Sequence, residues 1–274
     1  MMPLLKTIKE DFSQIFAISE KHIKLNLRFK VRFILYLIFP IVSILMPLII
    51  LNNFFNYNVQ FGYWNSDNYY VYLFIAYNIY LISNLANVFP SEFYLEKFWK
   101  TLPNLIVAPF KRIYLLFGIF FSHLILISIP FTILMIICYI FYPISFLSLL
   151  SVIGIYFLIA LIFSGIGLII GTFAISNENI MGVLEYAMMA VFWLSCITYP
   201  FEIFPPIIQF LINLNPLYYV FDFLRLSWIN NNILFTIITN LDSFFVLLIS
   251  SVAFPFIGIL LFNFIFKKYG IVGY

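Results

Sequence analysis

Charged residues are scarce in this chain of 274 residues. They make up 9% of the sequence, whereas hydrophobic residues make up 64%, and the mean hydropathy is +1.08. Soluble domains carry roughly 25% charged residues, so this composition excludes an ordinary soluble domain. From Ile113 to Asn177 there is no Asp, Glu, Lys or Arg at all. Such runs are long enough to cross a bilayer as helices, and the sequence therefore predicts an all-α polytopic membrane protein.

Residues that would support catalysis or metal binding are also few. The two cysteines, Cys138 and Cys196, lie in apolar stretches without metal-ligand spacing and are expected to be buried. The sequence contains no G-x-x-x-x-G-K-[ST] motif to hold ATP phosphates. No Ser/His/Asp set, metal-ligand cluster or carboxylate pair points to an active site. We expect no enzyme activity, no cofactor, no metal and no nucleic-acid partner.

Six apolar segments are long enough to be transmembrane helices, and together they cover most of the chain. Pro143 marks a tight turn between the third and the fourth, because proline interrupts a helix. We expect a cytoplasmic segment over residues 1–31 and a single transmembrane domain over residues 32–274. The predicted spans are about 32–51, 69–89, 113–139, 144–174, 183–200 and 241–266.

The distribution of basic residues predicts the orientation of these spans. Lysines and arginines cluster before the first span, between the second and the third, and after the sixth. If there are six spans, every lysine and arginine except Arg225 falls on the same side of the membrane. The positive-inside rule assigns that side to the cytoplasm, so we predict a multi-pass protein of the cell membrane with both termini cytoplasmic.

Two segments outside the spans have patterns of their own. The N-terminal segment places apolar residues at helical spacing between charged ones, which predicts an amphipathic helix on the inner leaflet, with a partly ordered basic tail as the alternative. Within residues 201–240, the apolar run 207–214 is too short for a span and has prolines at both ends. A re-entrant pair of helices before the last span fits this stretch, and Asp222 and Arg225 could pair within it.

Residues 91–112 form an island of charge between two apolar stretches. We predict a helix that begins after Pro90, with Ser91 as its N-cap and Glu92 near its positive end, and that stops at Pro103. This helix either transmits a mechanical force from outside the membrane to the spans, or it only anchors the loop at the membrane interface. Its apolar face is predicted to contain Leu95, Phe98, Trp99 and Leu102.

Two isolated features lie inside apolar segments. His123 could be a protonatable relay or substrate contact, but a hydrogen-bonded histidine near the cytoplasmic end is the interpretation we favour. The motif Gly167-x-x-x-Gly171 allows helices to approach closely. We expect it to serve packing within the chain rather than contact with a second copy.

The island and a later segment resemble a known family. Residues 96–118 read like E-x-x-x-x-T-L-x-x-L-x-V-x-P-x-x-R before a third span, as in the ABC-2 family of ABC-exporter membrane subunits. Residues 204–225 resemble the stretch before the last span of that family, and the six-span layout agrees over nearly the whole chain. The chain departs from the pattern at Trp99 and Lys100, where many members have Arg-Gly.

The resemblance implies a permease subunit that pairs, usually as a homodimer, with two copies of a separate ATP-binding subunit. In such transporters an amphipathic coupling helix contacts the ATPase, a role that here could fall to the N-terminal helix, to the island, or to both. The candidate coupling residues are Glu92, Glu96, Trp99, Lys100 and Arg112.

The cargo is predicted from composition alone. Aromatic residues make up 22% of the chain and buried charge is rare, which favours an apolar or amphipathic substrate, such as a drug-like molecule or a lipid-linked saccharide. Membrane lipid is a further expected partner. An ion- or proton-coupled secondary transporter is the alternative, but it would show paired intramembrane carboxylates or an inverted repeat. Candidate pathway residues in the re-entrant segment are Tyr218, Tyr219, Asp222 and Arg225.

Overall fold

The computed structural model describes residues 2–28, 30–56, 60–99, 112–176 and 178–269. These residues are almost entirely helical, as predicted, with an isolated β-bridge between Phe61 and Trp64. The helices are α1 (Met2–Arg28), α2 (Lys30–Asn56), α3 (Tyr69–Ser83), α4 (Leu85–Phe98), α6 (Arg112–Phe141), α7 (Phe146–Ser176), α8 (Glu178–Trp193), the 3-10 turn η1 (Phe201–Ile203), α9 (Pro206–Asn213), α10 (Pro216–Ile229), α11 (Ile233–Thr239) and α12 (Leu241–Tyr269).

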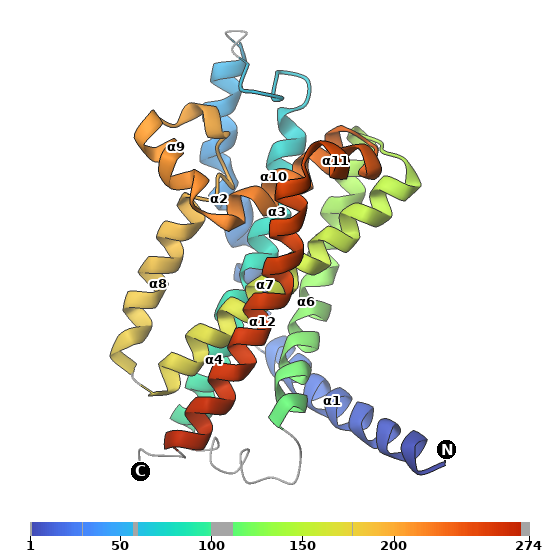
Figure 1. Ribbon diagram of the computed structural model, residues 1–274, viewed down its shortest axis with the longest axis vertical. Coiled ribbons are helices and arrows are strands. Elements are labelled where there is room, and N and C mark those ends of the chain that lie inside the picture. The colour runs from blue at the N-terminus through green and yellow to red at the C-terminus, as the bar shows by residue number, and fades with distance from the viewer. Residues whose placement is uncertain (1, 29, 57–59, 100–111, 177, 270–274) are drawn as a thin grey trace.

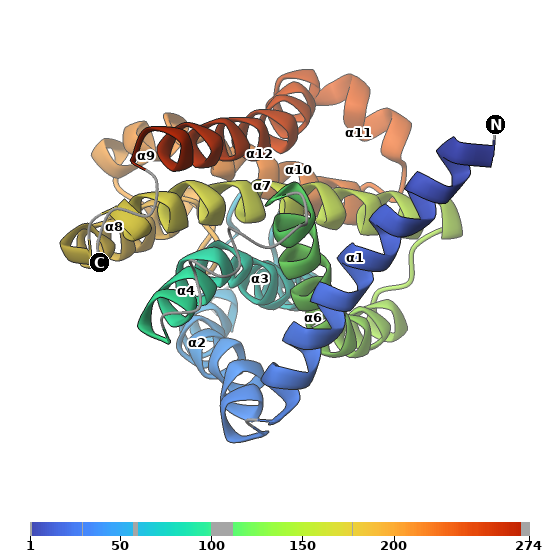
Figure 2. The same cartoon turned by 90° about the horizontal axis from the view of Figure 1, so that it is seen from below.

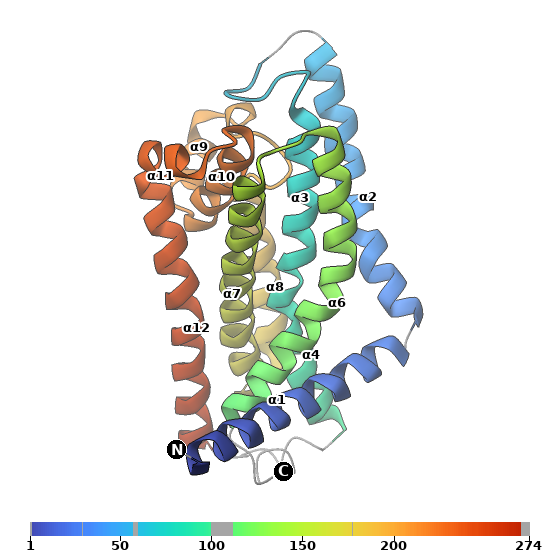
Figure 3. The same cartoon turned by 90° about the vertical axis from the view of Figure 1, so that its right-hand side faces the viewer.

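Most of these helices run lengthwise through the molecule. Figure 1 shows α2, α3 with α4, α6, α7, α8 and α12 side by side, whereas α9, α10 and α11 gather at the upper end. Helix α1 lies across the lower end at a steep angle to the bundle, where the last turns of α12 also lie (Figures 1 and 3). The two terminal helices therefore share one end of the bundle.

In the part of the chain that the structure describes, four helices are long and apolar enough to cross a membrane: Tyr69–Glu96, Ile113–Phe141, Phe146–Ala174 and Leu241–Ile265. They correspond to the second, third, fourth and sixth predicted spans. Helices α9 and α10 form a pair bent by 90°, which would raise the count to five if the pair were one broken span.

The first and fifth predicted spans, 32–51 and 183–200, remain predictions. Helix α8 has only 16 residues. In α2, the part that the structure describes in full contains one short apolar helix, Leu45–Phe55. Both helices run lengthwise beside the longer ones in Figure 1. Among the residues that the structure describes, four helices are thus both long and apolar enough to span a membrane, while the count of six rests on the sequence pattern.

The prediction that a new helix starts after Pro90 is wrong. Pro90 lies inside α4, and the second span continues through it to Glu96. Proline removes the hydrogen bond that the carbonyl of Ala86 would receive. In lipid, a neighbouring helix can compensate for this loss. Here α7 lies directly against that carbonyl, so Ser91 and Glu92 are interior residues of α4 rather than its start.

Glycines of α7 allow this close contact. A Cβ added to Gly167 would lie 2.6 Å from the carbonyl oxygen of Ala86, and one added to Gly171 would lie 2.9 Å from the nitrogen of Pro90. On another side of α7, a Cβ at Gly165 would lie 2.3 Å from the nitrogen of Pro255 in α12. The expectation that Gly167-x-x-x-Gly171 serves packing within the chain is thus confirmed, and α7 is the central helix of the bundle.

Substitution Gly167→Ala should therefore lower thermal stability. The added methyl group meets backbone atoms of α4, which cannot rotate away, and overpacking of this kind costs about 1–3 kcal/mol. Gly154→Ala in the same helix is the matched control, because its Cβ would meet nothing within 4 Å. Melting temperatures of the variants in lipid nanodiscs measure the effect. Equal melting temperatures for the two variants would show that α4 and α7 are not in close contact.

Candidate functional site

The N-terminal helix is fastened to the bundle by close packing on α6. Figure 2 shows α1 passing directly beneath α6. A Cβ at Gly118 of α6 would lie 2.5 Å from Cγ2 of Ile18, so the contact requires glycine. Ser19 Oγ, which is buried, lies 2.9 Å from the carbonyl oxygen of Ile15 and 3.0 Å from that of Gly118. Its hydroxyl group thus donates toward both helices.

An ion pair joins the same helix to α4. Lys21 Nζ lies 2.7 Å from Glu96 Oε1, and Glu96 is only 7% exposed. A buried carboxylate is costly unless it is paired, so Glu96 requires the cation that α1 supplies. The pair links two segments that lie 75 positions apart in the sequence.

A second polar contact lies one turn earlier along α4. Glu92 Oε2 is 3.0 Å from His22 Nδ1 of α1, and Glu92 Oε1 is 3.7 Å from His123 Nε2 of α6. His22 is 1% exposed. His123 Nδ1 lies 3.1 Å from the carbonyl oxygen of Ile119, as expected for a hydrogen-bonded histidine. We call these five residues the inner junction: Lys21, His22, Glu92, Glu96 and His123.

The predicted coupling residues thus fall into two groups. The carboxylates of Glu92 and Glu96 face α1, whereas Trp99 is 50% exposed, as is its neighbour on the predicted apolar face, Phe98, at 70%. Helix α1 therefore covers the polar face of α4, a long-range contact that helical periodicity does not reveal. Lys100 lies outside the described residues, and so does the side chain of Arg112, the first residue of α6.

At the opposite end of the bundle, Asn215 forms the corner of the bent pair. Its Oδ1 accepts a hydrogen bond from the backbone N–H of Leu217 and so caps α10. Its Nδ2 donates to the carbonyl of Val191 and to Ser195 Oγ, both 2.9 Å away. A single side chain therefore starts α10 and ties it to the end of α8.

Arg225 does not pair with Asp222, in contrast to the prediction. In the part of the chain that the structure describes, its Nη2 donates to the carbonyls of Cys196 and Ile197 at 2.8 and 2.9 Å. Its guanidinium carbon lies 3.9 Å from the ring centre of Tyr72, and the hydroxyl of Tyr72 also donates to the carbonyl of Cys196. Cys196 has a positive φ of 53°, a conformation that turns the chain after α8.

These two carbonyls explain why the expected ion pair is replaced. Because the chain turns out of α8 at this point, the carbonyls need donors, and Arg225 can satisfy both while it stacks on an aromatic ring. Tyr218 and Tyr219 are half-buried beside this cluster. Tyr218 stacks on Phe201 at 5.3 Å, and the hydroxyl of Tyr219 donates to the carbonyl of Asn213.

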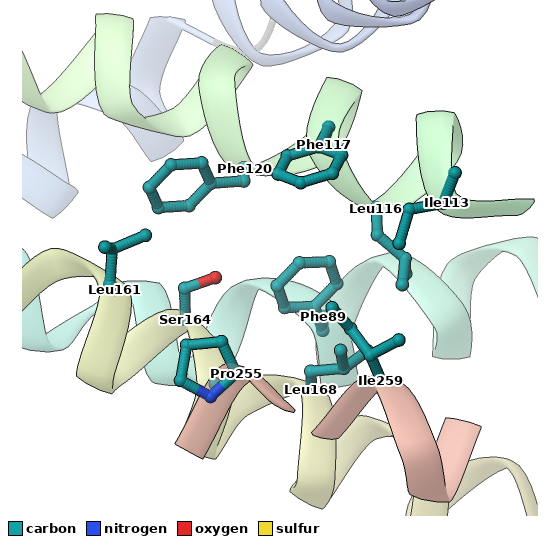
Figure 4. Close-up of a pocket in the computed structure, with 11 residues that line it drawn as sticks. Phe89, Ile113, Leu116, Phe117, Phe120, Leu161, Ser164, Leu168, Pro255 and Ile259 are labelled. Atoms are coloured by element: carbon teal, nitrogen blue, oxygen red, sulfur yellow. The ribbon is translucent and has the colours of Figure 1, made fainter. Parts of the chain in front are cut away.

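The described part of the chain contains pockets toward both ends of the bundle. Near the bent pair, a pocket of about 200 Å³ is lined by residues of α2, α3, the end of α8 and the segment that follows it, among them Pro47, Tyr80, Trp193 and Tyr199. Toward the lower end, a smaller pocket of about 60 Å³ lies between α4, α6, α7 and α12. Figure 4 shows its aromatic and aliphatic walls, in which Ser164 contributes the hydroxyl group.

Arg225→Met should lower the melting temperature clearly, because the carbonyl of Ile197 loses the donor that Arg225 supplies and the carbonyl of Cys196 keeps only the hydroxyl of Tyr72, at a cost of about 1–3 kcal/mol. Asp222→Asn should have a much smaller effect, since Asp222 does not hold the guanidinium. Thermal unfolding of both variants in nanodiscs makes the comparison. If Asp222→Asn proved as destabilising as Arg225→Met, the carboxylate rather than the carbonyls would be the true partner.

Comparison with known proteins agrees with this helical permease architecture. Residues 13–228 match the family model described as ABC-2 type transporter. A search among curated proteins found no match. The matched region covers most of the chain and includes α2, both ends of the bundle and the inner junction. Membership of this family implies an ATP-binding partner. The chain therefore belongs to the ABC-2 type transporters and is a multi-pass membrane permease.

Proposed function

We propose that this chain is the transmembrane subunit of an ABC exporter, in which a separate ATP-binding subunit acts on the membrane helices through the inner junction. The observation that carries this proposal is the ion pair between Lys21 and Glu96. It links α1 to α4 at the end of the bundle where the last turns of α12 also lie (Figures 1 and 3). A force applied at this end is therefore transmitted to α1, α4 and α6 together.

The six-span topology with both termini in the cytoplasm remains part of the proposal. The common end of α1 and α12 supports an even number of crossings. All three short helices α9, α10 and α11 lie at the opposite end, which supports a re-entrant pair on the outer side rather than a broken span. Under the positive-inside rule the junction end faces the cytoplasm.

Contact with the ATP-binding subunit falls to the exposed aromatic residues at the end of α4. Tyr94, Phe98 and Trp99 are 52%, 70% and 50% exposed, and the rings of Tyr94 and Phe98 stack at 6.5 Å. Aromatic residues of this kind are typical anchors of protein interfaces. Glu92 and Glu96, which face inward, then pass the movement to α1 and α6.

Two copies of the chain form the pathway in this proposal. Helix α8 packs mainly on α7, and Val183, Tyr186 and Trp193 are each more than 60% exposed. A lone apolar helix with exposed sides suits contact with a second copy. The pocket beside α8, α2 and α3 then faces the space between the copies, and Tyr218 and Tyr219 remain candidate pathway residues of the bent pair. Its mixture of aromatic and polar walls suits an amphipathic cargo, either drug-like or a lipid-linked saccharide.

The first test is co-purification with an ATP-binding subunit, followed by an assay of vanadate-sensitive ATP hydrolysis in liposomes. The expected result is a stable complex in which hydrolysis accompanies export. Purification of the chain without any ATPase, together with transport driven by an ion gradient, would support the secondary transporter instead.

Substitutions on the two faces of α4 should have different effects. Trp99→Ala should weaken binding of the ATP-binding subunit by about 30-fold, equivalent to about 2 kcal/mol for the loss of a central interface tryptophan. Glu96→Gln should leave the complex assembled but uncouple hydrolysis from export. Tyr63→Ala is the matched control, since Tyr63 is an exposed aromatic residue in the segment between α2 and α3, outside the inner junction. Normal export by both α4 variants would contradict the coupling assignment.

A further inference from the structure

A groove follows the N-terminal helix where α1 crosses α6. Its apolar walls include Phe12, Phe16 and Ile23 of α1 and Phe121 and Ile125 of α6, and its volume is about 750 Å³. We call it the crossing groove. Binding sites for drug-sized ligands commonly measure about 300–1,000 Å³, so the crossing groove has room for a substantial apolar group.

The walls of the crossing groove are exposed although they are apolar. Phe12 and Phe16 are 68% and 71% exposed, and Phe121 and Ile125 are 41% and 49% exposed. Contiguous apolar surface of this kind marks contact with a partner or with a membrane. An apolar occupant must therefore cover the groove when the protein is in its membrane.

The position of the crossing groove favours lipid as this occupant. A Cβ at Gly118 of α6 would lie against Ile18 of α1, so the two helices cross at this point. Phe121 and Ile125 follow about one and two turns later, within a helix that is long and apolar enough to cross a membrane. The groove thus lies on the side of α1 that faces the spans (Figure 3). A soluble subunit at the lower end of the bundle would contact the opposite side of α1.

A second copy of the chain suits the groove less well than lipid does. Helix α8, whose exposed side chains suit that contact, lies on the other side of the bundle from α6 (Figures 1 and 2). An amphipathic helix at a membrane surface, by contrast, buries its apolar residues among acyl chains. Acyl chains are therefore the occupant that both walls of the groove favour.

The charged residues of the crossing groove indicate the headgroup. Of the residues that line it, Glu20 and Lys24 carry charge, and Glu20 Oε1 lies 2.6 Å from Lys24 Nζ. Their side chains are 50% and 75% exposed, so both remain accessible. A phosphate can accept hydrogen bonds from Lys24 while a primary ammonium donates to Glu20. A headgroup with both charges is thus complementary to the pair, whereas an anionic headgroup would place its charge beside the carboxylate.

We propose that the crossing groove binds one phospholipid of the phosphatidylethanolamine class. An acyl chain packs between Phe16 of α1 and Phe121 of α6, the phosphate lies at Lys24 and the amine lies at Glu20. The lipid fills the angle between the two helices and so holds α1 at the membrane surface. Its assignment to the cytoplasmic leaflet rests on the proposed function, which sets the orientation of the chain, but the groove and its lipid do not.

Photocrosslinking of the full chain in nanodiscs tests this proposal. The nanodiscs contain phosphatidylethanolamine and phosphatidylglycerol with the same acyl chains, and a trace of phosphatidylethanolamine with a diazirine in one chain. After illumination, mass spectrometry of peptides locates the lipid adducts. Adducts on residues 12–24 and 121–125 should exceed those at Val252 and Phe256, exposed residues of α12 outside the groove, by about 5-fold or more. Equal adduct density at the two places would overturn the proposal.

A substitution that fills the groove provides the matched variant. Ser13 also lines the groove and is exposed, so Ser13→Trp adds a large side chain to the space without disturbing a buried contact. It should reduce the adducts on residues 121–125 to the level found at Phe256. Val252→Trp, at a position that is 69% exposed on α12, is the control and should leave the groove adducts unchanged. Full labelling of the groove in a folded Ser13→Trp protein would contradict the proposal.

Competition between headgroups tests the role of the Glu20–Lys24 pair. Unlabelled phosphatidylethanolamine should suppress the groove adducts more strongly than phosphatidylglycerol does, and Glu20→Lys should reverse this preference because it leaves two cations at the groove. Equal competition by the two lipids in the unmodified chain would overturn the headgroup assignment. None of these measurements requires an ATP-binding subunit, so the lipid site can stand if the proposed function fails, and can fail if that function stands.

Discussion

Lys21 and Glu96 form the interaction on which the lower half of this molecule depends. Glu96 is buried at the end of a membrane-spanning helix, where an unpaired carboxylate would be costly, and its cation comes from a helix that lies outside the spans. The ion pair, the Ser19–Gly118 contact and the Glu92 cluster together hold α1 against α4 and α6. The N-terminal helix is thus fastened to the bundle at three points.

The upper half is held by a different set of contacts. Arg225 satisfies two carbonyls at the turn after α8 and stacks on Tyr72, and Asn215 ties the corner of the bent pair to α8. Between the two halves, α7 packs on α4 and α12 through glycines that leave no room for a Cβ. A rigid central helix of this kind suits a permease, because movement at one end can reach the other without being absorbed by loose packing.

Local patterns in the sequence predicted much of this fold. Apolar runs identified the helices of membrane-spanning length, the prolines around residues 207–214 identified the bent pair, and Gly167-x-x-x-Gly171 identified a close helix contact. Pro90 was misjudged because its effect depends on α7, a neighbour that local sequence does not reveal. The same limit applies to Arg225, whose partners are backbone carbonyls, and to Glu92 and Glu96, whose partners lie on α1. Conversely, the presence of only two histidines was a signal that sequence inspection left unused.

The central claim is that the contact between α1 and α4 transmits movement, and exchange of the two charges tests it most directly. Lys21→Glu and Glu96→Lys should each uncouple ATP hydrolysis from export, because each places two like charges together. The double variant restores an opposite pair and should regain most of the coupling, measured as export per ATP hydrolysed in liposomes. If the double variant remains as uncoupled as the single ones although it folds and binds the ATPase, the ion pair is not the link on which this account depends.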